Sequence, residues 1–103
     1  MILVMGTARF GQGELERLKP ALAKNVAATR QEAGCEHYAY SVDLDDPNLL
    51  HVAERWTDGE STKAHMQTPH MAELMAALGS AGVEALDIHA YDATYRGPVF
   101  GGG

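Results

Sequence analysis

The spacing of apolar residues along this chain alternates between the two-residue period of a strand and the 3.6-residue period of a helix, and the order of these stretches limits the possible folds. The predicted strands cover residues 2–9, 35–43, 49–56 and 83–95, and the predicted helices cover residues 14–32, 60–67 and 69–78. A chain of 103 residues has the usual size of one domain. We therefore expect one domain over residues 1–95 and a flexible glycine-rich tail over residues 96–103.

Turn and capping signals separate the predicted elements. Gly34 stands where a left-handed residue would end the first helix, and residues 45–48 (Asp-Asp-Pro-Asn) supply a turn between two strands that should form a hairpin. Thr57 begins a capping box, and Thr68 followed by Pro69 starts a second helical piece. The resulting order of strand, helix, strand, strand, split helix and strand is that of the ferredoxin-like α+β fold, in which helices cover one face of a sheet.

The first and last strands carry apolar residues on both faces. The first strand places Ile2 and Val4 on one face and Leu3 and Met5 on the other, and the last strand repeats this arrangement. A sheet face that is open to water normally carries polar residues. We therefore expect two copies to pack their open faces together as a twofold-symmetric homodimer, a dimeric α/β barrel.

Charge and cysteine content limit the possible partners and compartment. Eight Lys and Arg against fourteen Asp and Glu give a formal net charge of −6, which repels nucleic acid and anionic membrane surfaces, so we expect neither as a partner. The single cysteine, Cys35, cannot form an internal disulfide, and the N-terminal run reads as a strand rather than as an export signal. These features favour a cytoplasmic protein.

Several short runs in the middle of the chain carry a recognisable pattern. They are Gly34-Cys35 followed by Tyr38, then Ser41-Val42-Asp43, then Glu54-Arg55-Trp56, and the run Ala64-His65-Met66-Gln67-Thr68-Pro69-His70-Met71. On these residues the chain resembles the antibiotic biosynthesis monooxygenase family, and within it the small bacterial quinol monooxygenases. The resemblance implies a dimeric α+β barrel that oxidises quinols or polyketide phenols with O₂, without metal or flavin. Many members of this family have no established substrate.

An oxygenase without a cofactor must make its substrate electron-rich, for example by removing a phenol proton, because dioxygen reacts poorly with closed-shell molecules. Such a site needs a base and a water-excluding cavity. The two-residue period places Val52, Glu54 and Trp56 on one strand face, which we assign to the helix side. Trp56 could stack on a flat substrate or pack in the core, and Glu54 could orient the base or form a structural pair with His65 or an arginine.

His65 and His70 flank the predicted helix break and are the candidates for the catalytic base, because imidazole titrates near neutral pH. A structural role in capping or in hydrogen bonding to the sheet is the alternative for each. The two histidines are five residues apart, with no carboxylate or cysteine between them, which is not a zinc-binding motif. We therefore predict no metal.

Further candidate contacts to a substrate come from other elements. Thr7 and Tyr91 could add polar contacts, and Met66, Met71 and Met75 could line an adaptable apolar cavity, although core filling explains the methionines as well. A haem-degrading relative of the family uses a strand-one asparagine, the strand-three tryptophan and a histidine midway along the last helix. Here Thr7 and Met75 stand at the asparagine and histidine positions, so we predict no haem and no other cofactor.

Three functions remain open from the sequence. The first is a cofactor-independent monooxygenase that acts on a small aromatic quinol or phenol. The second is a non-enzymatic dimer that binds a small molecule or acts as a stress-related domain. The third is an isomerase or cyclase on the same barrel, which would use the same base but consume no O₂.

Overall fold

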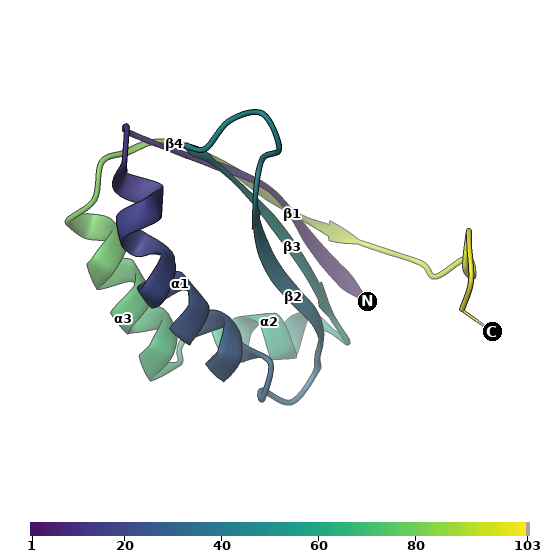
Figure 1. Cartoon of the computed structure of the whole chain (residues 1–103). Coiled ribbons are helices and arrows are strands. Elements are labelled where there is room, and N and C mark those ends of the chain that lie inside the picture. The colour runs from purple at the N-terminus through teal and green to yellow at the C-terminus, as the bar shows by residue number, and fades with distance from the viewer. Residues whose placement is uncertain (103) are drawn as a thin grey trace.

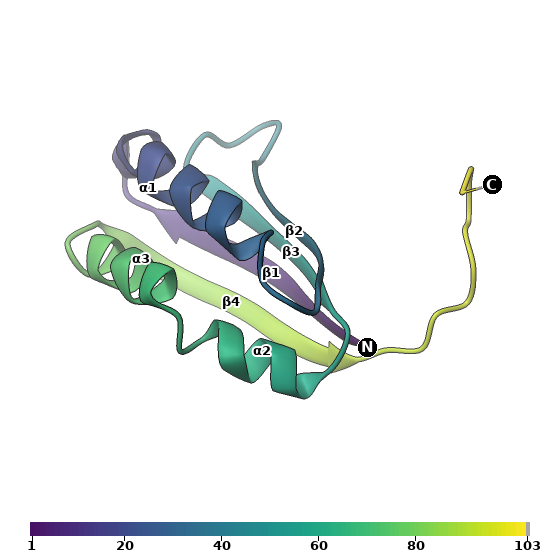
Figure 2. The ribbon, with the colours of Figure 1, turned by 90° about the horizontal axis from the view of Figure 1, so that it is seen from below.

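The structure is a computed structural model that describes residues 1–102. Within these residues the elements are β1 (Ile2–Phe10), α1 (Glu14–Thr29), β2 (Cys35–Val42), β3 (Leu49–Trp56), α2 (Gly59–His65), α3 (Pro69–Gly79) and β4 (Val83–Asp92). The strands form an antiparallel sheet in the order β2-β3-β1-β4. The helices lie on one face of this sheet, with α1 beside α3 (Figures 1 and 2). The predicted ferredoxin-like α+β fold with a split second helix is therefore confirmed.

Strand register decides which side chains face the helices. Val4 of β1 pairs with Glu54 of β3 and with Ala90 of β4, and Ala8 pairs with Leu50 and Leu86. Ala8, Phe10, Leu50, Val52 and Trp56 are buried, so the even-numbered residues of β1 and β3 face the helices. The sequence assignment of Val52, Glu54 and Trp56 to the helix side is confirmed.

The first helix is shorter than the sequence pattern indicated. Its buried stripe begins with three leucines and continues with Asn25 and Thr29, and the helix ends at Thr29. Gly34 has the expected left-handed backbone, with a φ of 84°, but it lies in the turn before β2 rather than at the helix end. Residues 30–34 therefore form a turn that carries Glu32 across the end of α1.

The cap of α2 is also displaced from its predicted position. The carboxylate of Asp58 accepts a hydrogen bond of 2.8 Å from the backbone N–H of Ser61, so Asp58 rather than Thr57 is the N-cap. The second start signal is confirmed, because the Thr68 hydroxyl accepts from the N–H of Met71 and Pro69 occupies the first turn of α3. The chain therefore breaks between α2 and α3 directly after His65.

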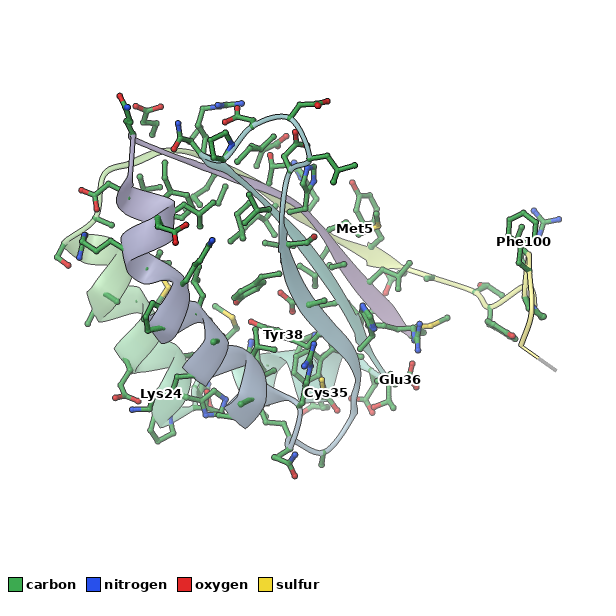
Figure 3. The ribbon with its side chains drawn as sticks, in the orientation of Figure 1. Met5, Lys24, Cys35, Glu36, Tyr38 and Phe100 are labelled. Atoms are coloured by element: carbon green, nitrogen blue, oxygen red, sulfur yellow. The ribbon has the colours of Figure 1, made fainter. Side chains whose placement is uncertain are left out.

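The sheet face away from the helices, here called the open face, carries apolar and polar side chains together. Its odd-numbered positions in β1 include Leu3 and Met5, and Met5 is half exposed. Figure 3 shows Met5 on this face and Tyr38 on the helix side of the sheet. In the described part of the chain, no helix is long and apolar enough to span a membrane.

The chain leaves the sheet after β4 and extends away from the domain (Figure 1). Val99 and Phe100 in this segment are 90% and 93% exposed to solvent. Gly103, the last residue of the predicted tail, lies outside the described residues.

Candidate active site

A cavity of about 390 Å³ lies between the helix-facing side of the sheet and helices α2 and α3. Most of its wall is apolar, and five polar or titratable side chains interrupt that wall: Tyr38, Tyr40, Glu54, Thr62 and His65. The apolar lining consists of Ile2, Val4, Val52, Met66, Met71, Leu74, Met75, Leu78, Leu86, Ile88 and Ala90. A mainly apolar hollow with a few convergent polar groups is typical of a small-molecule site. A second hollow of about 420 Å³, between α1 and β2, contains Lys19 and Arg30 but no candidate base.

His65 and His70 meet at one carboxylate, that of Glu32. The distance from Oε2 of Glu32 is 2.8 Å to Nδ1 of His65 and 2.7 Å to Nε2 of His70. The side chains are 15%, 4% and 18% exposed for Glu32, His65 and His70 respectively. We call these three residues the Glu32 triad. It forms because the break between α2 and α3 places both histidines beside the turn that follows α1.

The hydrogen bonds of the triad fix which nitrogen of each histidine ring carries a hydrogen towards Glu32. A carboxylate only accepts hydrogen bonds, so the ring nitrogen of each histidine that contacts Glu32 carries a hydrogen and donates a hydrogen bond to it. When His65 is neutral with its proton on Nδ1, its Nε2 is an acceptor. Among residues 1–102 no hydrogen-bond partner occupies this Nε2, and the His65 ring forms part of the cavity wall. His65 therefore has the arrangement of a general base.

Glu32 was not among the site residues expected from the sequence. A signal for it was present, because Glu32 continues the buried stripe of α1 after Asn25 and Thr29 at helical spacing. That stripe turns from leucines to polar residues towards the end of the helix. A buried polar face on an otherwise apolar stripe indicates polar partners on the neighbouring elements.

The Glu32 triad is also the group that could hold a metal ion. Its three ligand atoms lie within 4.8 Å of one another. The spacing of the two histidines alone does not match a zinc motif, but Glu32 adds a carboxylate to them from another part of the chain. The contacts of 2.7 and 2.8 Å have the length of charge-assisted hydrogen bonds, and we therefore treat the group as a hydrogen-bonded triad.

Trp56 lies behind the cavity wall rather than in it. Its side chain is completely buried, and the His65 ring lies over it at a centroid distance of 4.7 Å and an interplanar angle of 37°. Tyr38 approaches another part of the indole edge-on at 6.2 Å. The predicted stacking of Trp56 on a substrate needs correction, because His65 and the surrounding core already cover the indole.

Glu54 contacts Trp56 and not a histidine. Its Oε1 accepts a hydrogen bond of 2.9 Å from Nε1 of Trp56. The predicted role of Glu54 in orienting the base, and the alternative pair with His65 or an arginine, are therefore wrong, because Glu32 makes the histidine contact. Burial raises the pKa of Glu54, while the bond from Trp56 and the nearby His65 partly offset the rise. Glu54 thus remains a titratable group in the cavity wall.

A second polar cluster, here called the tyrosine pair, joins the cavity wall to α1. The hydroxyl oxygens of Tyr38 and Tyr40 are 2.5 Å apart, and Nδ2 of Asn25 lies 3.1 Å from each. Burial raises the pKa of both tyrosines, so their hydroxyls are neutral donors over the working range of pH. The two-residue period of β2 places Tyr38 and Tyr40 on the same strand face, and both line the cavity although neither was among the expected site residues.

The remaining predicted residues divide between the two faces of the sheet. Met66, Met71 and Met75 line the cavity, and Met71 is also part of the buried core, so both explanations given for the methionines apply to it. Thr7 pairs with His51 and Asp87, and Tyr91 pairs with Leu3, which places both on the open face. Their predicted contact with a substrate in the cavity is wrong, because successive residues of a strand point to opposite faces.

Comparison with known proteins gives a consistent result. The family model described as antibiotic biosynthesis monooxygenase matches residues 1–77. A candidate antibiotic biosynthesis monooxygenase from Deinococcus radiodurans has 30% sequence identity and a TM-score of 0.88, over 98% of this chain and 100% of that chain. A protein from Pseudomonas aeruginosa has 26% identity and a TM-score of 0.80, over 91% and 94% of the two chains. Another candidate member, from Nitrosomonas europaea, has 20% identity and a TM-score of 0.85 over 92% and 100%, and supports the fold alone. None of the curated proteins matches this chain.

Proposed function

The chain belongs to the antibiotic biosynthesis monooxygenase family, and from this premise we propose that it oxidises a small aromatic quinol or phenol with O₂ and without an added cofactor. The observation that carries the proposal is the position of His65. One ring nitrogen of His65 is held by Glu32, and the ring forms part of the wall of an apolar cavity. This arrangement suits removal of a proton from a phenolic hydroxyl.

The first step transfers the phenol proton to Nε2 of His65. The imidazolium that forms keeps its Nδ1–H on the Glu32 carboxylate, and the negative charge of Glu32 stabilises it. Glu32 also keeps the ring in the tautomer whose Nε2 can accept a proton. A positioned base of this kind contributes about 10²- to 10⁴-fold to a rate.

The apolar wall favours the oxidation that follows. A phenolate held against this apolar wall has fewer water contacts than one in bulk water, and it gives up an electron to O₂ more readily than the neutral phenol does. For a hydroquinol, the overall reaction with one O₂ gives a hydroxyquinone and one water. The substrate supplies all four electrons that O₂ accepts, so no external reductant enters the balance.

Oxygen uptake with a panel of hydroquinones tests the proposal. We expect uptake by the wild-type protein after dialysis against EDTA, and a loss of about 10²- to 10⁴-fold in His65→Ala. His89→Ala is the matched control, because His89 is an exposed histidine that pairs with Asp87 on the open face. No uptake by the wild-type protein, or equal uptake by His65→Ala, would contradict the proposal.

Two further measurements separate the alternative functions. Thermal stabilisation by aromatic ligands without product would support a binding protein, because a ligand that binds only the folded state stabilises it by mass action. Product formation that continues without O₂ would support an isomerase or cyclase.

We also propose that two copies pack through their open faces. Leu3 and Met5 lie on this face together with Tyr91, and Met5 and Tyr91 are each 52% exposed. A second copy would bury these side chains and form a closed, barrel-like core. Sedimentation at micromolar concentration should show twice the chain mass of 11.1 kDa. Met5→Glu should give the monomer, whereas Leu44→Glu, at a fully exposed loop position, should not.

A further inference from the structure

The Glu32 triad has the donor set of a site for a divalent transition-metal ion. One carboxylate oxygen and two imidazole nitrogens converge, and the three atoms lie within 4.8 Å of one another. Two histidines and one carboxylate are a ligand set that Zn²⁺ and other first-row divalent ions take in proteins, with positions left open for water. The triad therefore combines a suitable chemistry with atoms that already face one point.

The geometry of the triad needs only small movements to accept an ion. Oε2 of Glu32 lies 2.8 Å from Nδ1 of His65 and 2.7 Å from Nε2 of His70. In a tetrahedral zinc site the ligand atoms are about 3.3 Å apart, because each bond to the metal is about 2.0–2.2 Å long. Glu32 lies in the turn after α1, outside any helix or strand, so its side chain has room to move back from the two rings.

An ion held by the triad would lie behind the cavity wall. The His65 ring forms part of that wall, but neither Glu32 nor His70 lines the cavity. His70 instead lines a separate hollow of about 350 Å³ between α1 and α3, which offers an ion a route from solvent. The bound ion would therefore not touch a ligand in the cavity, and its effect would pass through the His65 ring.

Coordination would change which nitrogen of His65 carries the hydrogen. A neutral imidazole that binds a metal through Nδ1 carries its hydrogen on Nε2, and Nε2 can then no longer accept a proton. In His70 the hydrogen moves in the same way from Nε2 to Nδ1, so neither neutral ring gains or loses a proton overall. We propose that the Glu32 triad binds a divalent transition-metal ion, and that the bound ion inhibits the protein by removing its base. The inhibition rests on the proposed function, whereas the binding does not.

Two titrations of the EDTA-treated wild-type protein test the binding without substrate. Calorimetry with Zn²⁺ should show saturable binding of one ion per chain at the triad. Trp56 is the only tryptophan of the chain, and its ring centroid lies 4.7 Å from that of His65. Co²⁺, which quenches nearby indole fluorescence, should therefore quench Trp56 with the same saturation behaviour.

Two variants remove one ligand each and leave His65 in place. Glu32→Gln keeps the shape of the side chain but replaces the carboxylate with a weak amide ligand, and His70→Ala removes one imidazole. Loss of an outer-shell partner of a metal site already costs about 10- to 100-fold in affinity. Each variant should therefore lower the Zn²⁺ affinity by more than about 100-fold and abolish the saturable quenching by Co²⁺.

The controls are His51→Ala and His89→Ala. These histidines form exposed pairs with Asp43 and Asp87 respectively, and each pair offers only two ligands. Both histidines lie on the open face, across the sheet from Trp56. Neither variant should change the tight Zn²⁺ binding or the quenching of Trp56.

The oxygen-uptake assay tests the inhibition. Saturating Zn²⁺ should lower uptake by the wild-type protein about 10²- to 10⁴-fold, as loss of the base does, and EDTA should restore it. The remaining uptake of His70→Ala should not respond to the same Zn²⁺ concentration. If the wild-type protein takes up no oxygen at all, the proposed function fails, while calorimetry and fluorescence still decide whether the triad binds metal.

Three results would overturn the inference. One is the absence of saturable Zn²⁺ binding by the wild-type protein, which needs no variant to fold. Another is equal Zn²⁺ affinity in the wild type, Glu32→Gln and His70→Ala. The third is oxygen uptake that stays constant or rises when Zn²⁺ or Fe²⁺ is bound, since a rise would mean that the metal reaches the reacting atoms.

Discussion

Nδ1 of His65 and Oε2 of Glu32 lie 2.8 Å apart, although 33 residues separate them in the sequence. This contact joins the end of α2 to the turn after α1, and it fixes one nitrogen of the ring that forms part of the cavity wall. The chemical role of His65 therefore depends on a carboxylate from another part of the chain.

Glu32→Gln should lower kcat for oxygen uptake about 10- to 100-fold, less than His65→Ala does. The amide can still accept the Nδ1–H of His65, but it lacks the charge that stabilises the imidazolium. Glu36→Gln is the control, because Glu36 pairs with Arg55 at an exposed site. Activity of Glu32→Gln equal to that of the wild type would show that the carboxylate has no part in catalysis.

His70 should act as a positioning residue rather than as the base, because its Nε2 donates to the same Glu32 oxygen that holds His65. His70→Ala should lower kcat several-fold, since Glu32 loses one of its two donors and can turn away from His65. His70→Gln retains a side-chain N–H and should recover part of the loss. Steady-state kinetics of both variants test this positioning role, and equal activity of His70→Ala and His70→Gln would contradict it.

The sequence predicted local structure better than it predicted the site. The Thr68–Pro69 start of α3 follows from backbone chemistry within three residues, and the structure confirms it. The Glu32 triad depends on how α1, α2 and α3 pack together, which no local pattern encodes. His65 and His70 were therefore recognisable as candidates, while the carboxylate that joins them was not.

The wrong assignment of Thr7 has a different cause. The sequence of a strand shows which of its residues face the core only when one face is apolar and the other is polar. In β1 both faces are apolar at first, with Ile2 and Val4 on one and Leu3 and Met5 on the other. The pattern therefore could not decide which face holds the cavity, and the pairing of Val4 with Glu54 decides it.

Glu54→Gln should change the pH dependence of stability. Burial raises the folded-state pKa of Glu54 above its ordinary value of 4.5, and the groups near it are Trp56, His65, Glu32 and the tyrosine pair. Between the unfolded and the folded pKa the native state binds more protons, so the contribution of Glu54 to stability falls as pH rises through that window. A glutamine side chain does not titrate, so the free energy of unfolding of Glu54→Gln should rise relative to that of the wild type as pH rises through this window. Urea unfolding from about pH 4 to pH 8 measures the difference, and a constant difference would contradict the raised pKa.

Trp56→Phe should destabilise the fold by about 2 kcal/mol. The change removes the Nε1–H that bonds to Glu54 and leaves a void beneath the His65 ring. Tyr95→Phe, at an exposed position after β4, should stay within about 0.5 kcal/mol of the wild type. Chemical denaturation of both variants checks the prediction, and a fully stable Trp56→Phe would mean that the indole is not a core residue.

Gly6→Ala should damage both the stability of the domain and the cavity. A Cβ atom at Gly6 would lie 2.0 Å from the carbonyl oxygen of Asp87 and 2.5 Å from the Cα of Ile88, and both contacts are with the backbone of β4. Backbone atoms cannot turn aside as a flexible side chain can, so β4 must shift away from β1 at a cost of about 1–3 kcal/mol or more. Ile88 lines the cavity, and the shift should therefore also weaken ligand binding.

Gly79→Ala is the matched control for Gly6→Ala. A Cβ atom at Gly79, the last residue of α3, meets nothing within 4 Å, so this variant should be neutral or slightly more stable than the wild type. Thermal unfolding of both variants and their KM for hydroquinone in the oxygen-uptake assay separate the two effects. A Gly6→Ala protein with unchanged stability and affinity would show that β1 and β4 can separate without cost, and that the close approach of their backbones does not hold the cavity wall in place.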